Sequence, residues 1–132
     1  MSKYSRLTKY IDLLANENFG EWFIDKENDG TMEHPFQMPY VNYSRVVDDF
    51  IDDVYECCEE YGVHDYIQIL KAHNIDWGKK SMTNADVTEL TEEAILALLL
   101  GAIRAERFCD GALLAFLKNV SIKKWLLALT EK

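Results

Sequence analysis

The segment from Ala94 to Ile103 contains only apolar side chains and one glycine. A helix that is apolar on every side is buried against neighbouring elements in several directions. Glu92 and Glu93 precede the segment at the positive end of such a helix, where carboxylates are favoured. The segment has about half of the roughly 20 residues that a membrane-spanning helix needs. We therefore predict a buried central helix that starts at Thr91, and no membrane-spanning segment.

Apolar residues at helical spacing recur elsewhere in the 132 residues, a length that suits one domain. In the longest such segment, Ser44 stands as an N-cap and Gly62 follows at the position where glycine ends helices. We predict a mostly α fold, a single domain over residues 1–132 with five or six helices around the central apolar helix. The other helical segments are 7–15, 44–61, 65–73, 112–117 and a last one capped by Ser121.

Residues 19–43 differ from the rest of the chain because they contain both prolines and many aromatic side chains. Segments 21–24 and 36–41 have the composition of short strands, and Asn-Asp-Gly at 28–30 suits a tight turn between them. Pro39 lacks a backbone N–H, so it fits only an edge or the end of a strand. We predict a small extended or hairpin insert over residues 19–43.

The chain is acidic, with 23 Asp and Glu residues, 14 Lys and Arg residues and a formal net charge of −9. Nucleic acids and anionic membranes bind positively charged surfaces, so we expect the chain to bind neither. A protein that mimics nucleic acid is compatible with this charge, but it needs acidic side chains over a whole surface. Here residues 44–62 alone carry seven acidic side chains and one basic side chain.

On the predicted helix 44–61, Asp49, Asp52, Asp53 and Glu56 share one face without Lys or Arg at i+4. Like charges at this spacing each cost a few tenths of a kcal/mol. Three interpretations are open: a solvated face of an amphipathic helix, a surface for a basic partner protein or for the chain's own lysines, or a divalent cation site. Carboxylate oxygens are suitable ligands for Mg²⁺ or Mn²⁺.

The segment Ile103-Arg-Ala-Glu-Arg-Phe-Cys-Asp-Gly111 places a carboxylate where the central helix would present its next core side chain. Burying Glu106 is costly unless it is paired, and Arg104 and Arg107 are the nearest cations in sequence. One interpretation is an Arg–Glu network that fixes the packing of the helix. The other is a pocket in which both arginines bind a carboxylate or phosphate while Glu106 orients them.

The aromatic insert extends this second interpretation. If the insert covers the end of the central helix, His34 and Asp25 line the same pocket; otherwise its rings cap the core and its charged groups are solvated. The predicted ligand-binding residues are Arg104, Glu106, Arg107, His34 and Asp25, and the predicted metal ligands are Asp49, Asp52, Asp53 and Glu56.

The three cysteines, Cys57, Cys58 and Cys109, form neither a disulfide framework nor a zinc motif. Cysteine is among the most buried residue types, so we expect all three to pack in the interior. This usage favours a reduced, cytoplasmic setting. We expect no cofactor, with Mg²⁺ or Mn²⁺ on the acidic face as the alternative.

Three segments carry a resemblance to a known family: Ile103-Arg-Ala-Glu-Arg-Phe-Cys-Asp-Gly111, Gly20-Glu-Trp-Phe-Ile-Asp-Lys-Glu-Asn-Asp-Gly30 and Met38-Pro-Tyr-Val-Asn-Tyr43. With them the chain resembles a family of small uncharacterised bacterial proteins, classed as a domain of unknown function. The resemblance covers most of the chain and implies no activity. It implies that the aromatic insert and the Arg-Glu-Arg helix end belong to one unit.

The sequence thus favours a cytoplasmic bacterial interaction or accessory protein that uses its acidic helix face against a basic protein partner. The first alternative is a small-ligand or phosphate-binding protein, or an enzyme, with its pocket at the Arg-Glu-Arg segment. The second alternative is the divalent-metal site on the acidic helix. The sequence does not determine the oligomeric state or whether the chain is an enzyme.

Overall fold

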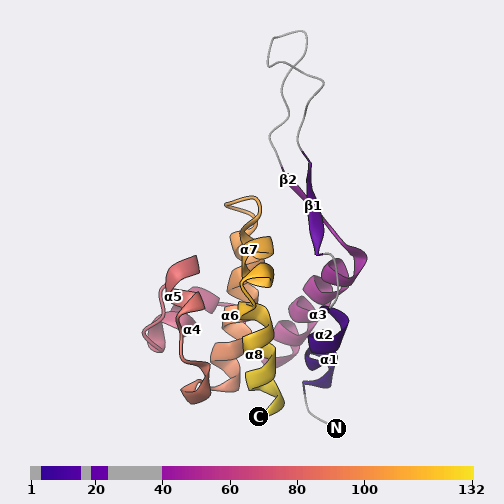
Figure 1. Cartoon of the computed structure of the whole chain (residues 1–132). Helices are drawn as coiled ribbons and strands as arrows, with labels where there is room; N and C mark the ends of the chain where they lie inside the picture. The colour runs from indigo at the N-terminus through magenta and orange to yellow at the C-terminus, as the bar shows by residue number, and fades with distance from the viewer. Residues whose placement is uncertain (1–3, 16–18, 24–39) are drawn as a thin grey trace.

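Helix α6 (Glu92–Ala105) lies at the centre of the molecule (Figure 1). The structure is a computed structural model, and it describes residues 4–15, 19–23 and 40–132. Every residue from Ala94 to Ile103 is buried, as the apolar sequence predicts. The side chain of Thr91 caps the helix by accepting a hydrogen bond from the N–H of Ala94 at 3.2 Å. The predicted central helix is confirmed.

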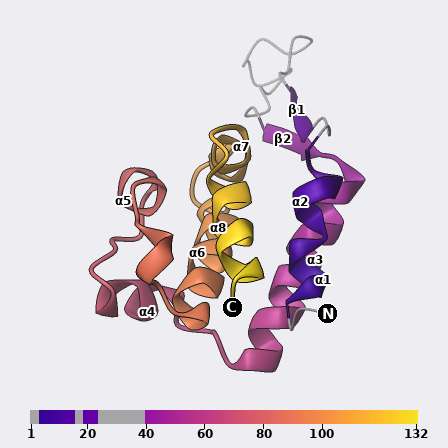
Figure 2. The same cartoon turned by 60° about the horizontal axis from the view of Figure 1, so that its bottom comes forward.

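Helices surround α6 on several sides. Helices α3 (Arg45–Tyr61), α4 (Tyr66–Ala72), α7 (Ala112–Lys118) and α8 (Ser121–Thr130) all contact it. Figures 1 and 2 both show α6 and α8 in the middle, with α3 on one side and α4 on the other. The fold is mostly helical with a small antiparallel sheet, so the predicted fold class is confirmed.

The remaining short elements complete this arrangement. Helices α1 (Ser5–Thr8) and α2 (Tyr10–Leu13) pack against α8, and α1 also contacts α3. Helix α5 (Lys79–Thr83) contacts α7, and the 3-10 helix η1 (Val87–Glu89) contacts α8. Among the described residues, no helix is both long enough and apolar enough to cross a membrane.

Helix α3 has the ends that its sequence predicts. The hydroxyl of Ser44 accepts a hydrogen bond from the N–H of Val47 at 3.3 Å, which satisfies a free donor of the first turn. The helix ends at Gly62, whose φ of 72° is the left-handed conformation that glycine adopts readily. Its buried stripe consists of Val47, Phe50, Val54, Cys57 and Cys58.

Three local predictions were wrong. The single helix expected over residues 7–15 is two short helices that meet at Lys9, and α5 lies outside the helical segments that the sequence predicts. The N-cap of α8 is Val120, at a φ of 60°, and not Ser121. The side chain of Asn119 accepts the hydrogen bond from the N–H of Ser121 at 2.9 Å, so the capping oxygen comes from a neighbouring residue.

The described ends of the insert form a two-stranded antiparallel sheet beside the helical body (Figure 1). Strand β1 (Gly20–Phe23) pairs antiparallel with β2 (Tyr40–Tyr43), with Gly20 opposite Tyr43 and Trp22 opposite Val41. The predicted first strand overlaps β1, and the described part of the predicted second strand, Tyr40 and Val41, lies in β2. The predicted turn at 28–30 lies outside the described residues.

Candidate functional site

Glu106 lies at the end of α6 and binds the backbone at the start of α7. Its Oε2 accepts a hydrogen bond from the N–H of Gly111 at 2.9 Å, and its Oε1 accepts one from the N–H of Leu113 at 3.0 Å. The first N–H groups of a helix have no partner within the helix, and the positive end of the helix favours a negative charge. Glu106 therefore joins two consecutive helices through its own carboxylate.

Tyr43 of β2 connects the hairpin to the same carboxylate. Its hydroxyl donates a hydrogen bond to Oε1 of Glu106 at 2.6 Å and accepts one from the N–H of Leu114 at 3.0 Å. Burial, followed by the hydrogen bond and negative charge of Glu106, raises the pKa of the Tyr43 hydroxyl above its usual value. The hydroxyl stays protonated and donates. Tyr43, Glu106 and the start of α7 form one polar junction.

The two arginines do not pair with Glu106 in the part of the chain that the structure describes. The Arg104 guanidinium lies over the ring of Tyr55, 5.7 Å from its centroid. Its Nε is buried and has no hydrogen-bond partner in the described part of the chain. Arg107 is exposed. Among the described residues, Glu106 is hydrogen-bonded to Tyr43 and to the backbone at the start of α7 instead of to the arginines. A network of the arginines with other carboxylates stays a prediction. The prediction that the arginines bind a ligand stays a prediction.

The two predicted members of this pocket that come from the insert cannot be placed with the others. Asp25 and His34 lie outside the described residues. Tyr43 is the residue of the insert that forms a hydrogen bond with Glu106. The expectation that part of the insert meets the end of the central helix agrees with this contact.

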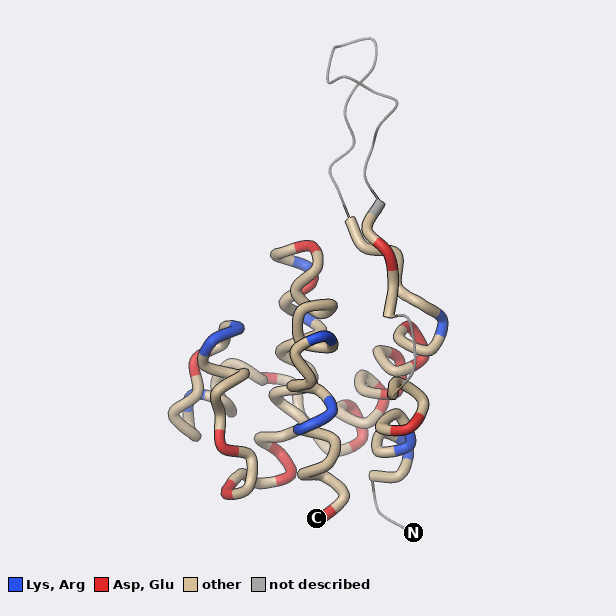
Figure 3. The backbone as a smooth tube through the Cα atoms, viewed as in Figure 1, with Lys and Arg blue, Asp and Glu red and all other residues tan. Residues whose placement is uncertain are grey.

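The acidic face of α3 is divided between paired and exposed carboxylates. Asp53 accepts a hydrogen bond from the Tyr10 hydroxyl at 2.5 Å, and its oxygen lies 3.5 Å from the Lys9 ammonium. Asp49, Asp52 and Glu56 are exposed. In Figure 3 acidic residues recur along α3, whereas Lys and Arg occur on α5 and α8.

The electrostatics of this face reflect its like charges. Partial burial raises the pKa of Asp48, and the neighbouring carboxylates of Asp52 and Asp49 raise it further. Among the described residues, no group of three His, Cys, Asp or Glu side chains is arranged to hold a metal ion. The metal site on Asp49, Asp52, Asp53 and Glu56 stays a prediction.

A pocket that the sequence did not predict lies between α5 and the turn that joins α6 to α7, with a volume of about 360 Å³. We call it the aromatic pocket, and it is lined by apolar groups that include Trp77, Met82, Phe108, Cys109 and Phe116. Phe108 is 76% exposed at its edge. The cysteine prediction was partly wrong, since Cys57 and Cys58 are buried but Cys109 is exposed.

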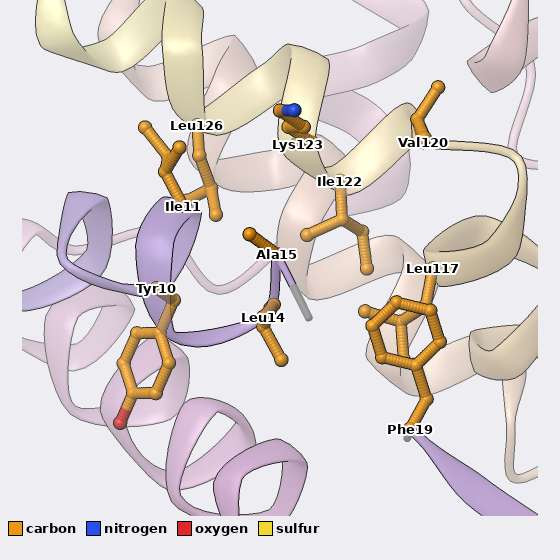
Figure 4. Close-up of a pocket in the computed structure, with 10 residues that line it drawn as sticks. All are labelled: Tyr10, Ile11, Leu14, Ala15, Phe19, Leu117, Val120, Ile122, Lys123 and Leu126. Atoms are coloured by element: carbon orange, nitrogen blue, oxygen red, sulfur yellow. The ribbon is translucent and has the colours of Figure 1, made fainter. Parts of the chain in front are cut away.

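A smaller pocket of about 110 Å³ lies between α2 and the α7–α8 turn (Figure 4). Apolar side chains surround it, among them Leu14, Phe19, Leu117 and Ile122, and Lys123 contributes to its edge. An apolar cavity of about 150 Å³ is already filled by benzene. This second pocket is thus too small for most metabolites.

A comparison with family models places the chain in a known group. Residues 1–131 match the model of a family of unknown function, DUF6508. The chain belongs to the DUF6508 family. No curated protein and no solved structure matches it.

In this DUF6508 protein, the residues that the sequence left out of the candidate site are Tyr43, Trp22, Trp77 and Phe108. Trp22 lies on the first predicted strand and Tyr43 is the last residue of the predicted insert, but their partners are far away along the chain. A Cβ on Gly111, for example, would lie 2.4 Å from the ring of Trp22. A signal for Phe108 did exist, because a large apolar residue stands among charged ones after the central helix. The match to DUF6508 covers the insert and the helix end together, as the resemblance implied.

Proposed function

We propose that the protein is a cytoplasmic bacterial accessory protein that binds a basic partner protein through the exposed carboxylates of α3. The observation that carries this proposal is the exposure of Asp49, Asp52 and Glu56, which form no ion pair with any described residue. At the edge of the face, Lys9 lies near Asp53 and Arg6 pairs with Glu60.

The spacing of these carboxylates suits a second helix. Asp49, Asp52 and Glu56 stand at i, i+3 and i+7, so they extend over about 10 Å along the axis of α3. Lys or Arg side chains at the same spacing on a partner helix would meet all three. Such exposed pairs steer association and set the orientation of the partner, and added salt weakens them.

The polar junction at Glu106 supports an interaction role over catalysis by this residue. Its carboxylate oxygens already accept hydrogen bonds from Tyr43, Gly111 and Leu113. A carboxylate held in this way stabilises the connection of elements and has little freedom to act as a general base. In our proposal the role of Glu106 within the Arg-Glu-Arg segment is structural.

The proposal can be tested with a defined probe, a synthetic helical peptide with Lys at i, i+3 and i+7. We expect Asp49→Asn, Asp52→Asn and Glu56→Gln combined to weaken its binding about tenfold, since exposed ion pairs contribute about 0.2 to 1 kcal/mol each. The matched control neutralises Glu89, Glu93 and Glu131, which are also exposed. Equal weakening by both triple variants, or amide shifts away from α3, would contradict the proposal.

A titration followed by the same amide shifts tests the alternative metal site. Mg²⁺ and Mn²⁺ are added separately at constant ionic strength. A saturable effect on the amide signals of α3 that is lost in the triple variant would assign the face to a cation. If Mg²⁺ and Mn²⁺ change the amide signals no more than NaCl does, a basic partner protein stays the explanation for the exposed acidic face of α3.

A second candidate function is the binding of a small anion at Arg104. The observation that favours it is the buried Nε of Arg104, a donor that has no hydrogen-bond partner among the described residues. Phosphate and acetate are compared with chloride at matched ionic strength, by amide shifts around Arg104 and Arg107. Arg104→Lys, which retains the charge but removes Nε, is expected to abolish a specific response, and Arg107→Gln tests the exposed neighbour. A response that survives Arg104→Lys would refute this candidate.

A further inference from the structure

We infer that the aromatic pocket binds a small zwitterion with an apolar body, which is the chemistry of an apolar α-amino acid. The site is separate from the acidic face of α3, and it shares the start of α7, at Gly111 and Ala112, with the polar junction at Glu106. It lies where α5 contacts α7, beside the turn after α6.

The volume of the pocket distinguishes it from the pocket of Figure 4. Ligand-binding pockets enclose about 300 to 1,000 Å³, and the aromatic pocket has about 360 Å³. The pocket beside α2 has about 110 Å³. The aromatic pocket alone of these two has room for a body the size of an aromatic side chain.

The wall of the pocket is built before any ligand arrives. The indole Nε1 of Trp77 donates a hydrogen bond to the carbonyl of Gly101 at 3.0 Å, which fixes the ring against α6. Tyr66 and Phe108 both pack edge-on against this ring, each with centroids 5.5 Å away. Gly101 allows the close approach, since a Cβ there would lie 3.3 Å from Cδ1 of Trp77 and 3.1 Å from Cε of Met82. A preformed wall lowers the entropy cost of binding.

The apolar edge of the pocket favours an apolar ligand body. Phe108 remains 76% exposed although it contacts Trp77. Covering a phenyl ring removes apolar surface from water, which is favourable by about 25 cal/mol per Å². A ligand with an aromatic or branched aliphatic group gains this free energy, and a wholly polar ligand does not.

The charges at the rim select a zwitterion. Lys79, at the start of α5, and Asp110, in the turn before α7, both line the pocket, and both are exposed. Neither forms an ion pair with a described residue. A simple anion is attracted by the Lys79 ammonium but repelled by the Asp110 carboxylate. A simple cation is attracted by Asp110 but repelled by Lys79. A molecule with a carboxylate and an ammonium group matches both.

The test uses four probes: L-phenylalanine, phenylacetate, phenethylamine and glycine. L-phenylalanine carries both charges and an apolar body. Phenylacetate keeps the body with the negative charge alone, and phenethylamine keeps it with the positive charge alone. Glycine carries both charges without the apolar body. Binding is followed by amide shifts of residues 108–112 and by the indole N–H of Trp77. We expect L-phenylalanine to bind about two- to fivefold more tightly than either singly charged probe, the range for exposed ion pairs, and glycine to give no shift.

Variants at the rim assign each charge. Lys79→Gln is expected to weaken L-phenylalanine and phenylacetate and to strengthen phenethylamine, and Asp110→Asn is expected to do the reverse. Lys80→Gln and Asp76→Asn are the matched controls, because both side chains are exposed but do not line the pocket. Thermal unfolding checks that the variants stay folded.

Each of the following results would overturn the inference: no saturable shift at residues 108–112, equal or tighter binding of phenylacetate or phenethylamine, or equal effects of Lys79→Gln and Lys80→Gln. Shifts confined to the lining of the pocket beside α2 would also overturn it. The proposed function on α3 is unaffected by any of these results, because none of the probes or variants involves its carboxylates.

Discussion

The hydroxyl of Tyr43 donates a hydrogen bond of 2.6 Å to the carboxylate of Glu106, and the two residues are separated by 63 positions in the sequence. The bond joins the hairpin to the end of the central helix. Glu106 in turn accepts hydrogen bonds from the first turn of α7. The orientation of the hairpin and the path of the chain after α6 therefore depend on the same carboxylate.

Replacing Tyr43 by Phe should destabilise the fold by about 1 to 3 kcal/mol. The ring is kept, but the Leu114 N–H loses its acceptor and Glu106 loses a donor. Urea unfolding measures the change. The control is Tyr66→Phe, because the Tyr66 ring packs on Trp77 while its hydroxyl forms no hydrogen bond with the described residues. Equal losses in the two variants would show that the Tyr43 hydroxyl has no special role.

Replacing Glu106 by Gln should cost about 1.5 to 3 kcal/mol, the range for hydrogen bonds to charged groups. The amide nitrogen of Gln is a donor and faces another donor in either orientation. At the position of Oε2 it faces the N–H of Gly111, and at the position of Oε1 it faces the Tyr43 hydroxyl and the N–H of Leu113. Hydrogen exchange should accelerate first in α7. Glu93→Gln, which neutralises an exposed carboxylate in the first turn of α6, is expected to cost only about 0.3 to 1 kcal/mol, the contribution of a charge near a helix end. Uniform acceleration over the whole chain would argue against a local capping role.

The sequence predicts those features that depend on nearby residues. The apolar run after Thr91 and the pair Ser44 and Gly62 define α6 and α3 because burial periodicity and capping are local properties. The partner of Glu106 could not be predicted in this way. The core pattern shows that a carboxylate at this position needs partners, but it does not show whether they come from arginines on the same helix or from a strand 63 residues away.

The same limit explains the start of α8 and the aromatic pocket. Ser121 has the residue type of an N-cap, but the side chain of Asn119 supplies the oxygen and Val120 takes the left-handed conformation. The pocket arises where Trp77 reaches the carbonyl of Gly101 on another helix. The spacing of residues along the chain does not predict this contact between Trp77 and Gly101.

Two glycines offer a matched comparison of backbone strain and side-chain contact. Gly62 and Gly111 have φ values of 72° and 88°, so Ala at either position should cost about 1 to 2 kcal/mol in the left-handed conformation. At Gly62 a Cβ meets nothing within 4 Å, whereas at Gly111 it would lie 2.4 Å from the ring of Trp22. We expect Gly111→Ala to cost more than Gly62→Ala, as measured by urea unfolding.

A double-mutant cycle identifies the origin of that difference. If contact with Trp22 causes the extra cost, Gly111→Ala should be less destabilising in a Trp22→Ala background than in the native chain. The Gly62→Ala cost should not depend on Trp22. Additive effects of Gly111→Ala and Trp22→Ala would mean that the indole ring moves away freely, and the hairpin would then not be fixed by this contact.

Stability should fall above about pH 10. Burial and a carboxylate partner raise the pKa values of Tyr4, Tyr10 and Tyr43 above the 10.0 of a free tyrosine. The folded state therefore holds these protons more tightly than the unfolded state does, so the stabilisation is complete below pH 10 and is lost as the pH rises towards the folded pKa values. Each such group removes at most about 1.4 kcal/mol per pH unit. Urea unfolding at pH 7, 9, 10 and 11 should show a smaller decline for Tyr43→Phe than for the native chain. The same decline in both would mean that the Tyr43 hydroxyl is not buried against Glu106.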